Sequence, residues 1–182
     1  SMGIDEGFGS SDFGIVITQG KDNAVEVIYA ESFNRPLHND MIDLIHKLKN
    51  KHRITKIFID ASNAGFISTL KYQLGDYDYR TYTEQKNIIN HMYDPRRDYN
   101  NVQVFPVNFA TMHKDMLANT NELLSAKKIK IHPTFQRLIT SLRTAVVNTN
   151  TGNLDKDATS YNDIFDAFTM SLLNYKLARP DH

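Results

Sequence analysis

The chain has 182 residues, in which 21 Lys and Arg balance 21 Asp and Glu, and it contains no cysteine. This length fits one domain with a full hydrophobic core, and 41% hydrophobic residues are typical of a folded globular protein. The lack of cysteine excludes a disulfide scaffold, a zinc ribbon and thiol catalysis. The zero net charge argues against an evenly basic nucleic-acid binder, but it leaves room for a local phosphate-binding patch or for metal ions.

The apolar pattern predicts strands and helices along most of the chain. Residues 3–5 look like the middle of a strand, and further strands are predicted at 13–18, 24–30, 56–60 and 102–107, with a short extended piece at 129–131. Helices are predicted at about 39–51, 111–125, 133–146 and 160–177. Asn39 is expected to cap the first of these helices, and Pro133 to open the third. The segment 61–91 begins like a helix and continues into a Tyr-rich stretch. The apolar runs are too short to span a membrane.

The order of these elements predicts an α/β fold. Three strands joined by tight turns come first, and the later strands are separated by helices. This order indicates a mixed sheet, with an antiparallel half and a parallel half, flanked by helices. The chain has neither a G-x-G-x-x-G motif after its first strand nor a G-x-x-x-x-G-K-[ST] motif. A doubly wound dinucleotide fold and ATP hydrolysis by a phosphate loop are therefore excluded.

Four aspartates occupy positions where a carboxylate is expected to be buried. A buried carboxylate requires a cation, hydrogen bonds or a raised pKa. Asp5 and Asp60 each follow apolar strand residues, so both emerge at the same edge of the sheet if their strands are neighbours. Asp163 and Asp166 lie three residues apart in the last helix and share a face. Each acid alone could be a turn residue, a helix cap or half of an ion pair. Taken together, they favour a shared site.

Several carboxylates at one point repel one another unless divalent cations neutralise them. Oxygen ligands suit Mg²⁺ or Mn²⁺ better than zinc or copper. Two such ions about 3.5–4 Å apart can clamp a phosphodiester, one activating water and the other stabilising the leaving oxygen. Acids at one site and basic residues around it are thus compatible with a phosphodiesterase.

Three motifs resemble the nuclease domain of the large terminase subunit, the DNA-packaging motor protein of tailed bacteriophages and herpesviruses. G-I-D-E-G-F-G-S-S-D-F-G-I-V-I-T looks like the first hairpin of that family, with its acid in the first strand. F-I-D-A-S-N-A-G is similar to the second acidic motif, and N-D-I-F-D-A-F to the motif of the last helix. The order and spacing of these motifs extend the resemblance over nearly the whole chain.

The resemblance implies a single ribonuclease H-like domain over 1–182, cut from a longer terminase large subunit, with Ser1-Met2 as the remnant of a tag. It also implies a Mg²⁺- or Mn²⁺-dependent endonuclease with two ions that cuts concatemeric viral DNA into genome lengths. The implied partners are double-stranded DNA, an ATPase motor domain, the small terminase subunit and the portal, in the host cytoplasm and without a membrane.

Carried over by position, the resemblance makes Asp5, Asp60 and Asp163 the catalytic metal-binding triad, with Asp166 as a possible fourth ligand. Glu6 stands where many relatives have a proline, so it could compete as a ligand. Asn162 stands where relatives often have an acid or a histidine, which leaves the choice between Asp163 and Asp166 open. Two other functions remain: a resolvase or transposase of the same fold, and an inactive DNA-binding or assembly module.

Basic residues and histidines give weaker candidates. Arg96 and Arg97 lie beside tyrosines, a combination that suits contacts with DNA. The histidines have no zinc-type spacing, but His113 or His132 could serve as a metal ligand or proton shuttle if it lies near the acids. Further candidates for phosphate contacts, which could equally form a solvated helix surface, are Lys114, Lys127, Lys128, Lys130, Arg137 and Arg143.

Overall fold

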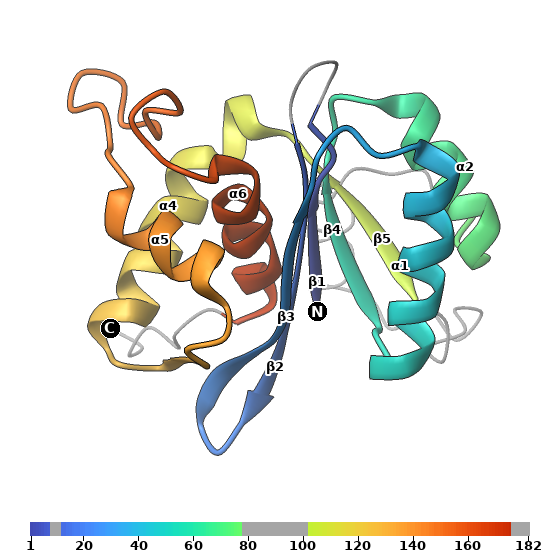
Figure 1. Ribbon diagram of the computed structural model, residues 1–182, viewed down its shortest axis with the longest axis horizontal. Helices are drawn as coiled ribbons and strands as arrows, with labels where there is room; N and C mark the ends of the chain where they lie inside the picture. The colour runs from blue at the N-terminus through green and yellow to red at the C-terminus, as the bar shows by residue number, and fades with distance from the viewer. Residues whose placement is uncertain (8–11, 78–101, 176–182) are drawn as a thin grey trace, which may run out of the picture.

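A six-stranded mixed sheet lies at the centre of the computed structural model, which describes residues 1–7, 12–77 and 102–175 (Figure 1). The strands are β1 Met2–Asp5, β2 Phe13–Lys21, β3 Ala24–Phe33, β4 Lys56–Asp60, β5 Gln103–Val107 and β6 Ile129–Ile131. Their order in the sheet is β5-β4-β1-β2-β3-β6. The pairs β1–β2 and β2–β3 are antiparallel, whereas the other three pairs are parallel. The predicted α/β fold with a mixed sheet is confirmed.

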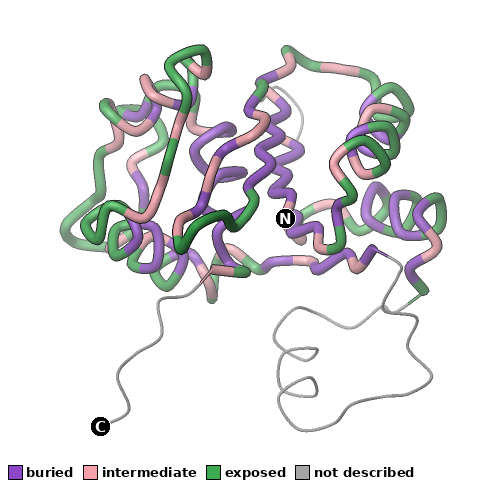
Figure 2. The backbone as a smooth tube through the Cα atoms, turned by 90° about the horizontal axis from the view of Figure 1, so that it is seen from below, coloured by how far each residue is buried: buried purple, intermediate pink, exposed green. Residues whose placement is uncertain are grey.

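Helices cover both faces of this sheet (Figure 1). One face carries α1 His38–His52 and α2 Ala64–Leu74. The other carries α4 Phe109–Ser125, α5 Gln136–Thr144 and α6 Asn162–Ser171, which continues as the 3₁₀ turn η1 Leu172–Asn174. Figure 2 shows the buried strands running between helices whose outer surfaces are exposed. None of the helices within the described ranges is long and apolar enough to cross a membrane.

Several predicted boundaries are wrong at helix ends. Asn39 does not cap α1, because the helix begins at His38 and its cap position, Leu37, makes no side-chain hydrogen bond. Pro133 lies three residues before α5, and α5 ends at Thr144 because the chain then forms a β-bridge. The last helix begins at Asn162, two residues later than predicted, and its α-helical part ends at Ser171. The Tyr-rich stretch around 79–91 and the end of the helix predicted to 177 lie outside the described residues.

Two glycines let α6 lie directly on the sheet. A Cβ atom at Gly3 of β1 would be 1.9 Å from the carbonyl oxygen of Ala167, and one at Gly14 of β2 would be 2.5 Å from that of Asp163. Any side chain at these positions would push the helix away. The glycines therefore fix the height of α6 above the ends of β1 and β2, where the predicted acids lie.

Candidate metal centre

Two neighbouring parallel strands carry acids to the same edge of the sheet. β1 pairs with β4 so that Ile4 lies opposite Ile59, which makes Asp5 and Asp60 neighbours as the next residues. Ile4 and Ile59 both belong to the core beneath α1 and α2. Because side chains alternate along a strand, Asp5 and Asp60 face the opposite side, toward α6. The sheet thus brings together two of the four predicted acids.

The close approach of α6 brings its two acids to this edge. The carbonyl of Asp163 lies over Gly14, which is the residue paired with Asp5 across β1 and β2. Asp163 is 8% exposed, and Asp166, almost one turn further along the helix, is fully buried. Both acids of the last motif therefore lie next to the acid of the first strand.

The acids raise one another's pKa values, and the causes of each shift indicate which acids interact. Burial raises the pKa of Asp5 well above its usual range, and the carboxylate of Asp166 adds to the increase. Burial also raises the pKa of Asp166, with a contribution from Asp60. The pKa of Asp163 rises to about 6 because of burial and of the nearby Asp12 carboxylate. Asp166 also acts on Asp163, and Asp163 acts on Asp5, so all four acids are linked electrostatically, with Asp12 beside Asp163.

A lysine that the sequence analysis did not single out lies within this group. Lys156, in the loop between α5 and α6, has its Nζ atom 3.1 Å from Asp166 Oδ2. Burial lowers the pKa of Lys156, but the carboxylates of Asp166, Asp5 and Asp60 outweigh this effect and raise it. The only signal in the sequence was its place in a polar, turn-rich segment just before the last helix. A cation is thus paired with Asp166 and also interacts electrostatically with Asp5 and Asp60.

Glu6 is a second acid in an unusual environment. It is 3% exposed, and neither carboxylate oxygen has a hydrogen-bond partner in the described part of the chain. Burial raises its pKa to about 7, and the carboxylate of Asp60 contributes. A buried carboxylate without partners is costly, and a nearby cation would reduce that cost. Glu6 therefore remains a candidate ligand.

The two candidate histidines lie in different places. His113 of α4 is buried, and its Nε2 atom is 3.9 Å from Asp166 Oδ1. Burial lowers the pKa of His113, although Asp166 opposes this effect, and the ring packs against Phe109. His132 follows β6, and its exposed ring contacts Thr134. Only His113 is next to the acids.

The candidate phosphate-binding residues do not form one face. The side chain of Lys114 lies against Gly152, in the loop that also carries Lys156. Arg137 donates a hydrogen bond to the carbonyl of Ser32, and its guanidinium lies 5.8 Å from the ring centre of Tyr161, just before α6. Both residues therefore flank the end of the sheet where the acids lie.

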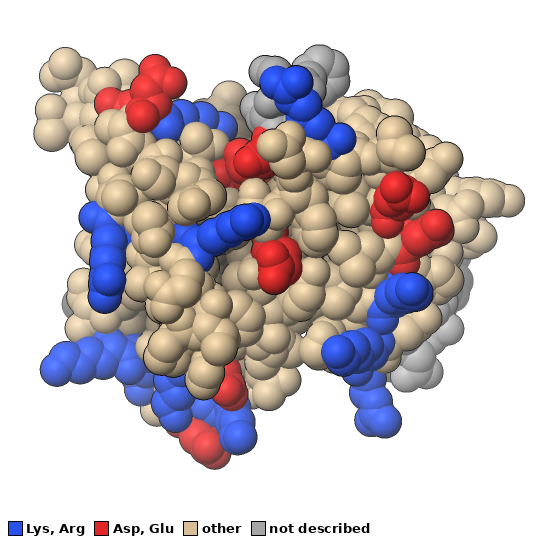
Figure 3. Space-filling model, viewed as in Figure 1, with Lys and Arg blue, Asp and Glu red and all other residues tan. Residues whose placement is uncertain are grey.

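The other basic candidates lie elsewhere. The backbone carbonyl of Lys128 accepts a hydrogen bond from the N–H of Val25 at the β2–β3 turn, and Lys127 precedes Lys128. That turn is separated from the acids by the length of β2, roughly 20 Å. Figure 3 shows basic side chains along the lower left of the molecule as well as near its top and at its lower right, so they are not confined to one region of this face. Arg96 and Arg97 fall outside the described residues.

The donor set fits a hard divalent cation. Within 1–7, 12–77 and 102–175, no three acidic or histidine side chains stand close enough to hold one ion in the present arrangement. The Lys156 ammonium instead supplies positive charge to Asp166, and the oxygens of Glu6 remain unpaired among the described residues. Carboxylate oxygens are the ligands that Mg²⁺ and Mn²⁺ prefer. The chemistry of these donor atoms therefore suits such an ion, and in the present arrangement protons and the Lys156 ammonium balance their charge.

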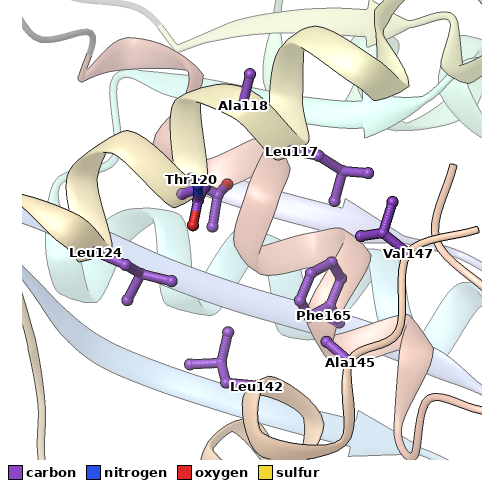
Figure 4. Close-up of a pocket in the computed structure, with 9 residues that line it drawn as sticks. Leu117, Ala118, Thr120, Leu124, Leu142, Ala145, Val147 and Phe165 are labelled. Carbon is purple, nitrogen blue, oxygen red and sulfur yellow. The ribbon is translucent and has the colours of Figure 1, made fainter. Parts of the chain in front are cut away.

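An apolar pocket on the same side of the sheet is separate from the acids. It has a volume of about 460 Å³ and lies between α4, α5 and α6, with Leu117, Thr120, Leu142 and Phe165 among its lining residues (Figure 4). Its lining contains no charged side chain. The pocket therefore adds nothing to the metal centre.

The raised pKa of Glu6 predicts a pH effect that a substitution can isolate. The folded protein keeps this proton up to about pH 7, whereas the unfolded chain releases it near the ordinary value of 4.5. The wild type should therefore lose stability relative to Glu6→Gln as the pH rises from about 4.5 to about 7. We expect the two melting temperatures to be similar near pH 4.5, and Glu6→Gln to melt higher at pH 8.

The comparison with Glu6→Gln is needed because other groups act in the opposite direction. Burial lowers the pKa of the Ser1 amine to about 6, and it also lowers that of His113. Both groups make the folded protein more stable as the pH rises, and they are present in both proteins. A difference in melting temperature that does not grow between pH 4.5 and pH 8 would contradict the assignment to Glu6.

Comparisons with known proteins place this arrangement in a known fold. The sequence matches no family model and no curated protein. The nuclease domain of the large terminase from bacteriophage SPP1, with bound Mn, has a TM-score of 0.59 at 17% identity, over 94% of this chain and 83% of that one. The large terminase nuclease from thermophilic phage G20c has a TM-score of 0.64 at 12% identity, over 96% and 81%.

A longer structure is similar as well. The large terminase from thermophilic bacteriophage D6E has a TM-score of 0.64 at 12% identity, and the match covers 93% of this chain and 37% of that one. Structures of the G20c nuclease contain magnesium, cobalt or zinc. At these identities the likeness demonstrates the fold, and the chain has the ribonuclease H-like fold that the motifs implied.

Proposed function

We propose that this chain is a metal-dependent DNA endonuclease domain that hydrolyses phosphodiester bonds with two Mg²⁺ or Mn²⁺ ions. The observation that carries the proposal is the meeting of Asp5, Asp60 and Asp166 around a cation at one edge of the sheet. Each acid comes from a different element: β1 and β4 are inner strands of the sheet, and α6 packs directly on β1. Such a position suits a site that must hold ions at fixed separation.

In this proposal Asp166 takes the place of third ligand, and Asp163 has a supporting role. Asp166 is fully buried and acts on Asp5 more strongly than Asp163 does, whereas the acid that acts most on Asp163 is Asp12. When bound, the two ions would supply an activated water and stabilise the leaving oxygen.

The protein's own residues orient these ligands. Asp60 accepts hydrogen bonds from the backbone N–H and the hydroxyl of Ser62, which fix its carboxylate. His113 lies beside Asp166, with its Nε2 atom 3.9 Å from Oδ1, and burial lowers the pKa of its ring. Asp5 accepts a hydrogen bond from the N–H of Gly7. Each ligand is thus held by a neighbour that is not itself a ligand.

The biological setting that we propose is viral DNA packaging, in which the domain cuts concatemeric DNA in the host cytoplasm. Three similar structures are large terminases or their nuclease domains. The D6E large terminase has also been solved with ADP, and the chain covers 38% of it. We therefore propose that the domain works with an ATPase motor domain, the small terminase subunit and the portal, and that it acts on double-stranded DNA.

Cleavage of supercoiled plasmid tests the proposal. The wild type is expected to cut plasmid in Mn²⁺ and to stop when EDTA removes the metal. Asp60→Asn keeps an acceptor for Ser62 but removes a charged ligand, so we expect cleavage to fall by about 1000-fold. Asp43→Asn, which changes an exposed acid of α1 on the opposite face, is the matched control and should cut normally.

Three results would contradict the proposal in different ways. Undiminished cutting by Asp60→Asn would remove this residue from the site. Cutting confined to four-way junctions would favour a resolvase. A wild type that neither cuts DNA nor gains thermal stability from Mn²⁺ would favour an inactive binding or assembly module, because a ligand that binds the folded state must stabilise it.

A further inference from the structure

We propose that Lys156 is a further residue of this site, which neutralises Asp166 until a metal binds and then contacts the DNA phosphate. The proposal rests on the metal-dependent function described above. Its basis is the position of the Lys156 ammonium, 3.1 Å from a carboxylate that has no exposed surface. The side chain of Lys156 is itself 57% exposed. It therefore joins the buried acids to the solvent from which DNA must approach.

The backbone around Lys156 is held in place, so the contact is built into the loop. The Oδ1 atom of Asp155 accepts hydrogen bonds from the N–H groups of Asp157 and Ala158. The Thr159 hydroxyl donates to the carbonyl of Asp155 at 2.7 Å. The side-chain amide of Asn162 in α6 donates to the carbonyl of Lys156 itself. These hydrogen bonds fix the backbone on both sides of Lys156.

The same loop is tied to the helix before it. The N–H of Asp155 donates to the carbonyl of Val146 just after α5, and the N–H of Val146 donates to the Thr159 hydroxyl. The N–H of Ser160 donates to the hydroxyl of Thr144, the last residue of α5. The base of the Lys156 side chain is therefore fixed relative to α6. Only its flexible methylene chain is free to move the ammonium.

The groups around the Lys156 ammonium determine how it would respond when a divalent cation binds. Lys156 interacts electrostatically with Asp5 and Asp60 as well as with Asp166, and its Nζ lies 5.8 Å from the ring centre of Phe109. A divalent cation bound by these acids would repel an ammonium a few ångströms away. Since the backbone of Lys156 is fixed, the displaced ammonium must remain at the mouth of the site. A phosphate held by the ions would lie within its reach, and a Lys ammonium is a common phosphate contact.

Lys156→Met separates the two roles because methionine keeps the length of the side chain without its charge. We expect Mn²⁺ to bind this variant about five- to tenfold more tightly than the wild type, measured by calorimetry without DNA, because a competing cation is gone. At saturating Mn²⁺, we expect the KM for plasmid to rise about tenfold, because a phosphate contact is lost. A role in folding alone would lower the melting temperature without tightening metal binding.

Lys47→Met is the control, since it removes the same charge from an exposed position of α1 on the other face of the sheet. It should leave both the Mn²⁺ affinity and the KM unchanged. Unchanged or weaker Mn²⁺ binding by Lys156→Met would overturn the proposal, and so would an unchanged KM. A wild type that binds no Mn²⁺ would instead refute the nuclease function, and the inference with it.

Discussion

Asp166→Asn is expected to reduce Mn²⁺-dependent cleavage by about 1000-fold and to abolish the rise in melting temperature that Mn²⁺ causes. The reason lies in the position of Asp166 rather than in its motif. It is fully buried, it pairs with Lys156, and its carboxylate acts on Asp5. Asparagine has the same shape but cannot carry the negative charge that a divalent cation requires.

Asp163→Asn is the matched variant, since it makes the same chemical change less than one turn away on the same helix. Asp163 lies over β2 and is influenced by Asp12 more than by Asp166. We expect its loss to reduce cleavage only about tenfold, as is typical of residues that support a metal ligand. A larger loss for Asp163→Asn than for Asp166→Asn would make Asp163 the third ligand, as the motif alone had assigned it.

Unfolding does not complicate this comparison. Burial raises the pKa of both Asp163 and Asp166, so the charged form of each is unfavourable in the folded protein. A neutral asparagine at either position removes that cost. In Asp166→Asn, Lys156 loses its partner but can remain hydrated, because its side chain is largely exposed. Without metal, both variants should melt at or above the temperature of the wild type.

The features that sequence revealed are those that depend on local pattern. The run K-I-F-I-D predicted β4 with the observed bounds, and the three-residue spacing of Asp163 and Asp166 predicted one helix face. The mixed sheet followed from the order of strands and helices. Asp5 and Asp60 could be expected at one sheet edge only on the assumption that their strands are neighbours. The parallel pairing of β1 with β4 shows that the two strands are neighbours.

The features that sequence did not reveal depend on contacts between distant elements. Lys156 lies in a polar loop, and nothing in its neighbours indicates that it reaches Asp166. Lys127 and Lys128 look like part of a basic patch, but pairing of β6 with β3 carries them to the far end of the sheet. Gly3 looks like an ordinary glycine until α6 is seen to pack on it. Register, loop path and helix height are set by packing of the whole domain.

Gly3→Ala is expected to destabilise the protein by about 3 kcal/mol or more, because a core with no room for the added methyl must shift. Its Cβ atom would lie 1.9 Å from the carbonyl oxygen of Ala167 and 2.7 Å from the amide nitrogen of Ser171, and both are backbone atoms of α6 that cannot rotate away. At roughly 2–4 °C for each kcal/mol in a protein of this size, the melting temperature should fall by about 10 °C.

Gly65→Ala is the matched control, since it adds the same methyl group where no neighbour lies closer than 3.5 Å. Position 65 is inside α2, where alanine is favoured over glycine by about 1 kcal/mol, so this variant should be as stable as the wild type or slightly more stable. In Gly3→Ala, by contrast, α6 must move away from β1 and carry Asp166 with it. A displacement of about 1 Å can cost 100-fold in rate, so cleavage should fall even at temperatures where the variant is folded. If Gly3→Ala proved as stable as Gly65→Ala, α6 could not rest on β1, and Asp166 would lose its place beside Asp5.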